Sequence, residues 1–267
     1  MSTDNKNASC EVLSFSRRSL YYQSKQEVKD WNTKQMIETV LRDNTSYGHK
    51  RLAQNLKINK KRVLRVMKKY GIKPYRRTVK SPWKTSKNKG FIFPNLLLTE
   101  IPLYKNHIWA TDFTYLKFQG KWLYVSTVID LYSREIIGLS ISKSHNTQLI
   151  LNTMLDAMMN NQRPKIIHSD RGSEYTAKDF TDFCSNMKII QSMSHPGCPW
   201  ENGYQESFYK GFKVELADYN RFKSLGELVS EIYLQIHYYN NKRIHSAFGI
   251  SPKQFAIQNE GVTIYNI

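Results

Sequence analysis

The amino-acid sequence predicts an α/β fold, a mixed five-stranded sheet flanked by helices, preceded by a small all-α domain of helix-turn-helix character. Two observations lead to this prediction. Residues 107–240 alternate between strand and helix periodicity, and the segment before them has helical periodicity and is rich in Lys and Arg. A chain of 267 residues has room for one main core and a smaller appendage.

The predicted sheet begins with three aromatic-rich segments of alternating polarity, at residues 107–118, 121–131 and 134–142. The turns between them are short enough for antiparallel hairpins. Further along, we expect helices near residues 147–160, 177–186, 203–217 and 225–240, and strands at 165–168 and 189–192. The order β-β-β-α-β-α-β-α predicts a mixed sheet, and strand ends in such sheets are the usual place for a functional site.

The net charge of +18 is concentrated in one segment of the chain. Residues 50–89 hold sixteen of the 40 Lys and Arg and none of the 22 Asp and Glu, so the remainder is close to neutral. Apolar residues in the first half of this segment recur at helical spacing, with Asn59 as a cap for the last helix. A basic helix of this kind can lie along a nucleic-acid backbone. The candidate DNA-binding residues are Lys60, Lys61, Arg62, Arg65, Lys68 and Lys69.

A block of like charge is also typical of a solvated linker, and that interpretation stays open. Because Lys outnumbers Arg in the block, we expect contacts to phosphates rather than recognition of base edges. The predicted domains are an N-terminal segment (1–30), the basic helical domain (31–80), a basic linker (81–98), the sheet-containing core (99–220) and C-terminal helices that complete the core (221–267).

Composition excludes several classes of protein. A hydrophobic fraction of 40% with 13% aromatic residues argues against a disordered basic tail. No stretch approaches the roughly 18 apolar residues of a membrane span, and the first residues lack the apolar core of a secretory signal, so we expect the chain inside the cell. Cys10, Cys184 and Cys198 show no C-x-x-C spacing, which indicates neither a disulfide framework nor a thiolate zinc site.

Three carboxylates are placed so that they can meet at one edge of the predicted sheet. Asp112 lies within the first strand, Asp170 ends the fourth, and Glu206 lies on the helix after residue 203. Each has a structural alternative. Asp112 can be a buried aspartate whose hydrogen bonds are satisfied within the fold, and Asp170 can be an ordinary turn residue. Glu206 can form a solvated ion pair with Lys213, two helical turns later. Unpaired carboxylates that converge would repel one another. Two Mg²⁺ ions about 4 Å apart would relieve the repulsion and suit a phosphodiester displacement.

The helix after residue 203 follows a loop with two prolines and two glycines, a type of loop that places binding groups on a rigid scaffold. Residues at a spacing of four predict its buried stripe: Tyr204, Phe208, Phe212 and Leu216. Glu206, Lys210 and Lys213 fall on a different face of this helix.

At these residues the sequence resembles a known family. WATDFTYL around Asp112, HSDRGSEY around Asp170 and HPGCPWENGYQESFYKGFKVEL around Glu206 are similar to OrfB transposases of insertion sequences with overlapping OrfA and OrfB frames, which share an RNase H-like integrase core. The 35 residues between Asp170 and Glu206 match the spacing of that family's Asp-Asp-Glu (DDE) triad, and Lys213 matches its basic residue seven positions later. YGHKRLAQNL, NKKRVLRVMKKYGIKP and YYNNKRIHSAFGISPKQF extend the resemblance over roughly residues 14–257.

The resemblance implies a DDE transposase that cleaves and transfers DNA strands during transposition. Asp112, Asp170 and Glu206 would be its catalytic residues and would bind two Mg²⁺ or Mn²⁺ ions; Lys213, and more weakly Lys210, would contact the DNA end. The implied partners are the element's terminal repeats and target DNA, an OrfA or OrfAB fusion product and further copies of the chain, with no membrane. The implied location is the bacterial cytoplasm, at the nucleoid. Positions around the site would be His168, Ser169, Arg171, Asn202 and Gly203.

Two other functions stay open. One is a catalytically inactive or truncated DNA-binding regulator derived from such a transposase. The other is a nuclease of the same fold that acts on RNA–DNA hybrids, which the basic segment 50–89 and the motif YYNNKRIHSAFGISPKQF, the C-terminal signature, disfavour. Two interpretations of the C-terminal signature are equally good: its residues cap the end of a helix, or they contact DNA. The residues concerned are Tyr239, Asn240, Asn241, Arg243 and His245.

Overall fold

A computed structural model of the chain describes residues 25–75 and 93–260. The chain divides into two compact units, one up to Pro74 and one from Tyr75 onward. Most of the predicted N-terminal segment and of the predicted basic linker lies outside the described residues. No helix within the described ranges is long and apolar enough to cross a membrane.

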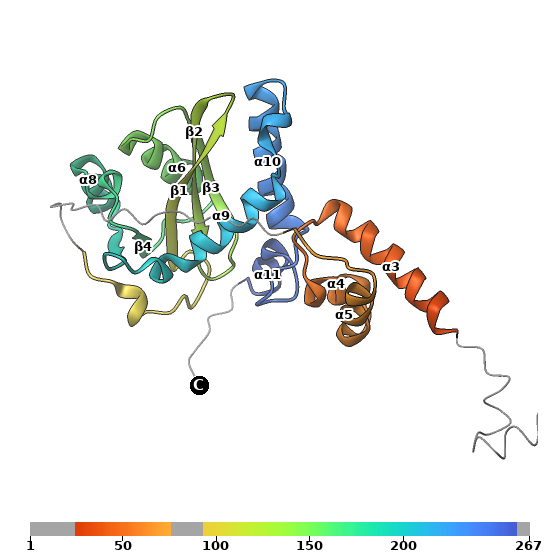
Figure 1. Cartoon of the computed structure of the whole chain (residues 1–267). Coiled ribbons are helices and arrows are strands. Elements are labelled where there is room, and N and C mark those ends of the chain that lie inside the picture. The colour runs from red at the N-terminus through yellow and green to blue at the C-terminus, as the bar shows by residue number, and fades with distance from the viewer. Residues whose placement is uncertain (1–24, 76–92, 261–267) are drawn as a thin grey trace, which may run out of the picture. The chain divides into compact units, whose positions relative to one another are not determined.

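In its described residues, 25–74, the first unit contains the helices α3 (Gln26–Asp43), α4 (His49–Leu56) and α5 (Lys60–Lys69) (Figure 1). The side chain of Asn59 accepts a hydrogen bond from the backbone N–H of Lys61 at 2.9 Å, so the predicted cap of the last helix is confirmed. Apolar residues from all three helices and the α3–α4 turn form its core: Ile37, Tyr47, Leu52, Ala53, Val63, Val66 and Met67.

The second unit is built on a five-stranded sheet. Its strands are β1 (Ile108–Phe118), β2 (Lys121–Asp130), β3 (Ile136–Ser142), β4 (Ile166–Ser169) and β5 (Ile190–Met193). They are ordered β3-β2-β1-β4-β5, with the β1–β2 and β2–β3 pairs antiparallel and the β1–β4 and β4–β5 pairs parallel. The predicted mixed five-stranded sheet is therefore confirmed.

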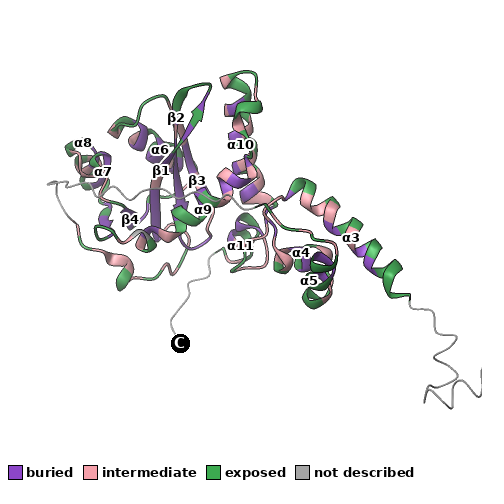
Figure 2. Cartoon of the chain, viewed as in Figure 1, coloured by how far each residue is buried: buried purple, intermediate pink, exposed green. Residues whose placement is uncertain are grey.

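Helices cover both faces of this sheet (Figure 1). One apolar cluster joins the sheet to α6 (Thr147–Met159), α7 (Ser173–Thr176) and α8 (Lys178–Asn186). The other joins it to α9 (Gly203–Glu215) and α10 (Leu225–Asn241). Short elements complete the unit: η1 (Leu96–Leu98), η2 (Pro199–Asn202), η3 (Tyr219–Arg221) and α11 (Pro252–Gln258). Figure 2 shows most of the strand residues buried between the two layers, with exposed residues at the hairpin end of β1 and β2.

The buried stripe of α9 differs from the predicted one. Phe208, Phe212 and Leu216 are buried as expected, but Tyr204 is 43% exposed, so its assignment to the core is wrong. The guanidinium of Arg134 lies 3.8 Å from the centre of the Tyr204 ring. Gln205, fully buried, takes the inward position instead, because it hydrogen-bonds to the sheet. A polar residue of this kind carries no signal in a hydrophobic pattern.

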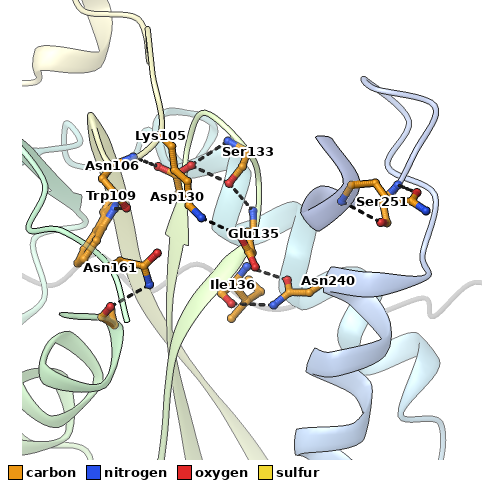
Figure 3. A network of polar contacts seen from close by, with 12 residues as sticks. Lys105, Asn106, Trp109, Asp130, Ser133, Glu135, Ile136, Asn161, Asn240 and Ser251 are labelled. Carbon is orange, nitrogen blue, oxygen red and sulfur yellow. Dashed lines mark hydrogen bonds and ion pairs between the residues drawn. The ribbon is translucent and has the colours of Figure 1, made fainter. Parts of the chain in front are cut away.

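A polar network closes the β2–β3 turn and joins it to α10 (Figure 3). The buried carboxylate of Asp130 accepts hydrogen bonds from the N–H and hydroxyl of Ser133. The side-chain amide of Asn240 pairs with the backbone of Ile136 in both directions, at 2.8 and 2.9 Å. The last turn of α10 is therefore fixed against the start of β3.

The remaining residues of the C-terminal signature are also engaged within the fold. Tyr239 is buried, and the guanidinium Nε of the buried Arg243 donates to Glu215 at 2.7 Å. The side chain of Asn241 donates to the carbonyl of His237 one turn earlier. These contacts give Tyr239, Asn241 and Arg243 structural roles at the end of α10.

Candidate active site

Asp112 lies in the part of β1 that runs past the short strand β4, and its side chain is half-buried. One carboxylate oxygen accepts a hydrogen bond from the backbone N–H of Phe113 at 2.8 Å. Burial, followed by the charge of Asp170, raises the pKa of Asp112 well above its usual value, while the charge of Lys213 lowers it. Asp112 and Asp170 thus lie close enough for each charge to affect the other.

Asp170 follows β4 directly and begins a tight turn. Its carboxylate accepts a hydrogen bond from the N–H of Gly172 at 2.9 Å, a local contact typical of aspartate in turns. The surroundings of this carboxylate raise its pKa, mainly by desolvation and then through the charge of Glu174, although its side chain remains exposed. A Cβ atom at Gly172 would lie 3.0 Å from an oxygen of both Asp170 and Glu174. Glycine here lets two carboxylates approach the same backbone position.

The Pro- and Gly-containing loop before α9 is attached to the Asp170 turn. The N–H of Ser194 donates to the carbonyl of Ser169 at 3.0 Å, and the Nε of Arg171 donates to the carbonyl of Ser194 at 2.9 Å. Glu201 holds the loop from inside, because its carboxylate accepts from the N–H of His195 at 2.6 Å and from the side chain of Asn95 at 2.8 Å. The position at which α9 begins is therefore coupled to the Asp170 turn.

Two buried side chains of α9 bind the backbone of the sheet beside Asp112. The amide of Gln205 donates to the carbonyl of Ala110 at 2.7 Å and to that of Thr127 at 3.2 Å. The hydroxyl of Tyr209 lies 2.7 Å from the carbonyl of Asp112 and accepts a hydrogen bond from Thr127. Burial raises the pKa of Tyr209 well above its usual value, so the hydroxyl stays protonated. It therefore donates the hydrogen bond to the carbonyl of Asp112.

Glu206, Lys210 and Lys213 occupy other positions on α9. Glu206 and Lys210 are exposed, whereas Lys213 is half-buried. The Lys213 ammonium lies 5.0 Å from the centre of the Tyr115 ring, and its charge acts on Asp112. Glu206 also contributes to the raised pKa of Asp112, as the smallest of the five causes.

Of the three predicted carboxylates, two interact with each other and the third lies apart. Within residues 25–75 and 93–260, no group of three or more His, Cys, Asp or Glu side chains is close enough to hold a metal ion. Asp112 and Asp170 affect each other electrostatically, and Glu206 is further out on the exposed side of α9. The assembled part of the candidate site is thus the pair of aspartates.

Comparisons with known proteins assign the family. Residues 103–199 and 187–252 each match a family model described as Integrase core domain. The transposase for insertion sequence element IS904 from Lactococcus lactis is 32% identical over 253 residues, which cover 88% of this chain and 98% of that relative. The chain belongs to the insertion-sequence transposases. Transposase InsF for insertion sequence IS3A from Escherichia coli is 30% identical and covers 94% of both chains.

A solved structure supports the fold of this transposase. A chain from the simian T-cell lymphotropic virus intasome, solved with the PP2A regulatory subunit B56 gamma, matches with a TM-score of 0.56 over 83% of this chain and 74% of that one. At 17% identity this likeness shows the fold alone. The predicted transposase with an RNase H-like integrase core is confirmed by the family and the fold together, and its class is that of DNA-cleaving and strand-transferring enzymes.

The residues predicted to surround the site of the transposase make mainly structural contacts. They are His168, Ser169, Arg171, Asn202 and Gly203. His168 is buried, and burial lowers its pKa to about 4, so the ring is neutral near pH 7. Its Nδ1 lies 2.8 Å from the hydroxyl of Ser192 on the neighbouring strand. Asn202 is buried, and Gly203 begins α9. The carbonyl of Ser169 and the guanidinium of Arg171 attach the loop to the turn through Ser194.

The candidate DNA-binding residues of α5 divide into two groups. Arg65 donates two hydrogen bonds, at 2.6 and 2.7 Å, to the carboxylate of Asp30, which is fully buried on α3, and Lys69 lies 3.4 Å from the same carboxylate. Arg62 donates to Thr33 and to the carbonyl of Lys29. The other group comprises Lys60, Lys61 and Lys68, which are exposed; Arg65 and Lys69 are exposed as well, but their side chains also bind Asp30.

Sequence reasoning missed two groups of residues near the site. Gln205 and Tyr209 contact strands about 80 to 100 residues away in the sequence, and no local pattern predicts such contacts. Glu174 stands within the motif HSDRGSEY, four residues after Asp170, so the motif could have indicated it. The short helix α7 brings its carboxylate close to the backbone of Gly172. Its carboxylate lies 2.7 Å from Nδ1 of His145, on the loop before α6.

Proposed function

We propose that Asp112, Asp170 and Glu206 form the catalytic group of this transposase and bind two Mg²⁺ or Mn²⁺ ions. The observation that carries the proposal is the pairing of two desolvated carboxylates: burial raises the pKa of both aspartates, and the charge of Asp170 raises that of Asp112 further. Carboxylate oxygens are the ligands that hard cations prefer. Two bound ions would supply activation of the attacking oxygen and stabilisation of the leaving oxygen in a phosphodiester displacement.

The protein's own contribution is to position these ligands. Tyr209 and Gln205 hold the backbone around Asp112, and Gly172 holds the carboxylate of Asp170 through its N–H. Glu206 would complete the ligand set from α9 when metal and DNA bind. Lys213, beside Asp112 and Tyr115, would bind a phosphate near the DNA end, with Lys210 one turn earlier as an additional contact.

The triad is tested by removing single negative charges. We expect Asp112→Asn and Glu206→Gln to abolish strand cleavage and strand transfer on labelled element ends, and to leave DNA binding nearly unchanged. Asp182→Asn is the matched control, since it neutralises an exposed carboxylate on α8. Full activity in either triad variant would exclude the triad. DNA binding without cleavage in the wild-type protein, under all metal conditions, would favour the inactive regulator.

We propose that α5 of this transposase contributes phosphate contacts to the terminal repeats or target DNA. The support is the exposure of Lys60, Lys61 and Lys68 within a segment free of acidic residues. Arg62, Arg65 and Lys69 would contribute less, because their side chains already bind α3.

The salt dependence of binding tests this contribution. Replacing the three exposed lysines by Gln should flatten the slope of log K against log salt by about 0.9 for each phosphate that the variant no longer neutralises. A control with the same change in net charge replaces three exposed lysines of the second unit, Lys178, Lys223 and Lys253. Equal slopes for the two triple variants would return α5 to the solvated-linker interpretation.

We also propose that the chain acts as a homo-multimer on DNA together with an OrfA or OrfAB fusion product. The family supports this, and the simian viral chain of similar fold was solved in an intasome. Light scattering of the chain with a DNA end should show more than one copy per complex. Strand transfer should rise when the OrfA fusion is supplied, and equal transfer with and without it would contradict the partnership.

A further inference from the structure

A row of aromatic side chains lies on one face of the β1–β2 hairpin. Tyr115 pairs with Tyr124 across the two strands, and Lys117 pairs with Trp122. Residues that pair across antiparallel strands point to the same face, and so do residues two apart in a strand. Phe113, Tyr115 and Trp122 therefore share one side of the hairpin.

The outer part of this row is open to solvent. Tyr115 is 51% exposed and Trp122 is 46% exposed, and their ring centres are 5.2 Å apart at an interplanar angle of 85°. Two exposed aromatic rings in contact with each other can form part of a binding surface.

The inner part of the row leads toward Asp170. The ring of His145 is stacked on Phe113, with centres 5.8 Å apart and planes within 10°, and lies 4.8 Å from that of Tyr124. Nδ1 of His145 is 2.7 Å from Glu174, the residue that approaches the Gly172 backbone together with Asp170. The row thus runs from the Asp170 turn to the outer part of the hairpin.

Two cations flank the exposed rings. The ammonium of Lys213 lies 5.0 Å from the centre of the Tyr115 ring, and that of Lys117 lies 5.7 Å from the centre of the Trp122 ring. Aromatic faces together with lysines match an unpaired nucleotide, which has a flat base and a charged phosphate. The bases of a duplex are stacked on one another and only its phosphates are accessible. A duplex would therefore contact the lysines of this surface but not its aromatic rings.

We propose that Tyr115 and Trp122 stack against unpaired nucleobases of a single-stranded DNA end, with Lys117 and Lys213 at its phosphates. The proposal rests on the proposed function, because it takes DNA as the substrate at Asp112 and Asp170. Stacking on aromatic side chains tolerates any base, so the surface would hold a frayed end without reading its sequence.

The experiment compares two DNA probes in the absence of divalent metal, so that no strand is cut. One is a blunt duplex, and the other is the same duplex with a short oligo(dT) tail, placed on either strand. Fluorescence anisotropy gives the Kd of the full chain for each. We expect the tail to strengthen wild-type binding by about tenfold for each stacked base. Tyr115→Ser/Trp122→Ser should lose this advantage and keep its affinity for the blunt duplex.

Two controls separate stacking from other effects. Tyr115→Phe/Trp122→Phe keeps both rings and should keep the advantage of the tail, and Tyr233→Ser removes a ring that is 54% exposed on α10 and should also keep it. The proposal is overturned if the serine variant retains the advantage of the tail, or if it loses tailed and blunt binding equally. It is also overturned if the tail gives the wild-type protein no advantage.

The outcome is distinct from that of the catalytic proposal. If the tail strengthens binding through Tyr115 and Trp122 but the wild-type protein never cleaves DNA with metal present, the stacking surface stands and the triad fails. If the protein cleaves DNA but the tail has no effect, the triad stands and the stacking surface fails.

Discussion

At the scale of single residues, the position of Asp112 depends on a partner that sequence reasoning did not find. Asp112 is recognisable from its strand and its motif, because a carboxylate in an apolar alternating segment is unusual. Tyr209 is not recognisable in the sequence, because it resembles any other aromatic residue of an amphipathic helix. Its hydroxyl nevertheless binds the carbonyl of Asp112 itself.

We predict that Tyr209→Phe destabilises the core by about 1–2 kcal/mol, since the part-buried carbonyl of Asp112 loses the hydrogen bond from Tyr209. Denaturant unfolding measures the change. Strand cleavage should fall more than DNA binding, because the variant loosens the backbone that carries Asp112. Tyr233→Phe, in which an exposed tyrosine loses its hydroxyl, is the control. Unchanged stability and cleavage in Tyr209→Phe would show that this hydrogen bond does not position Asp112.

Asp30 gives the first unit a dependence on pH. The hydrogen bonds from Arg65 hold the pKa of Asp30 well below its usual range. A carboxyl group with a lowered pKa in the folded state adds stability above its unfolded pKa, and that stability is lost as the pH falls through the folded value.

We therefore expect wild-type α3 and α5 to be more protected from hydrogen exchange than in Asp30→Asn at pH 7. The difference between the two proteins should shrink steadily below about pH 4. Asp43→Asn, at an exposed carboxylate at the end of the same helix, is the control. A difference that stays constant down to pH 2 would contradict the assignment.

At the scale of elements, the sequence predicts helices and strands well but predicts less about which side of a helix is buried. The strands and helices of the core lie within a few residues of their predicted positions. The inward face of α9 was only partly predicted, because Gln205 faces inward through hydrogen bonds to Ala110 and Thr127. Hydrophobic periodicity reports apolar burial, and such a polar residue is invisible to it.

The contact between β3 and α6 depends on a glycine. A Cβ atom at Gly138 would lie 2.5 Å from the carbonyl oxygen of Thr153 and 2.8 Å from the Cβ of Ala157. Gly138→Ala should destabilise the core by about 1–3 kcal/mol, because the helix must move away from the sheet. Thermal and denaturant unfolding measure the effect.

Gly226→Ala is the matched control for this prediction. Its added Cβ has no neighbour closer than 3.8 Å, and it should change stability by no more than about 0.5 kcal/mol. Equal stability of the two alanine variants would mean that α6 can shift on the sheet without cost.

At the scale of the whole molecule, charge and carboxylates are divided between different parts of the chain. The basic excess lies in residues 50–89, and the candidate catalytic acids lie in the second unit. Composition and motif spacing predict this division and the fold class, since both are properties of the linear sequence. The geometry of the acids is a different matter. Spacing predicts that Asp112, Asp170 and Glu206 can meet, but how closely they approach depends on the loop before α9 and on what binds there.

The central claim is that these three carboxylates make one divalent-metal site, and direct measurement of Mn²⁺ binding tests it most directly. Electron paramagnetic resonance of free Mn²⁺ gives the number of bound ions and their affinity for the full chain in the presence of a DNA end. We predict two bound ions for the wild-type protein, and loss of binding in Asp112→Asn, Asp170→Asn and Glu206→Gln. Mn²⁺ binding by all three variants with wild-type stoichiometry and affinity would contradict the claim.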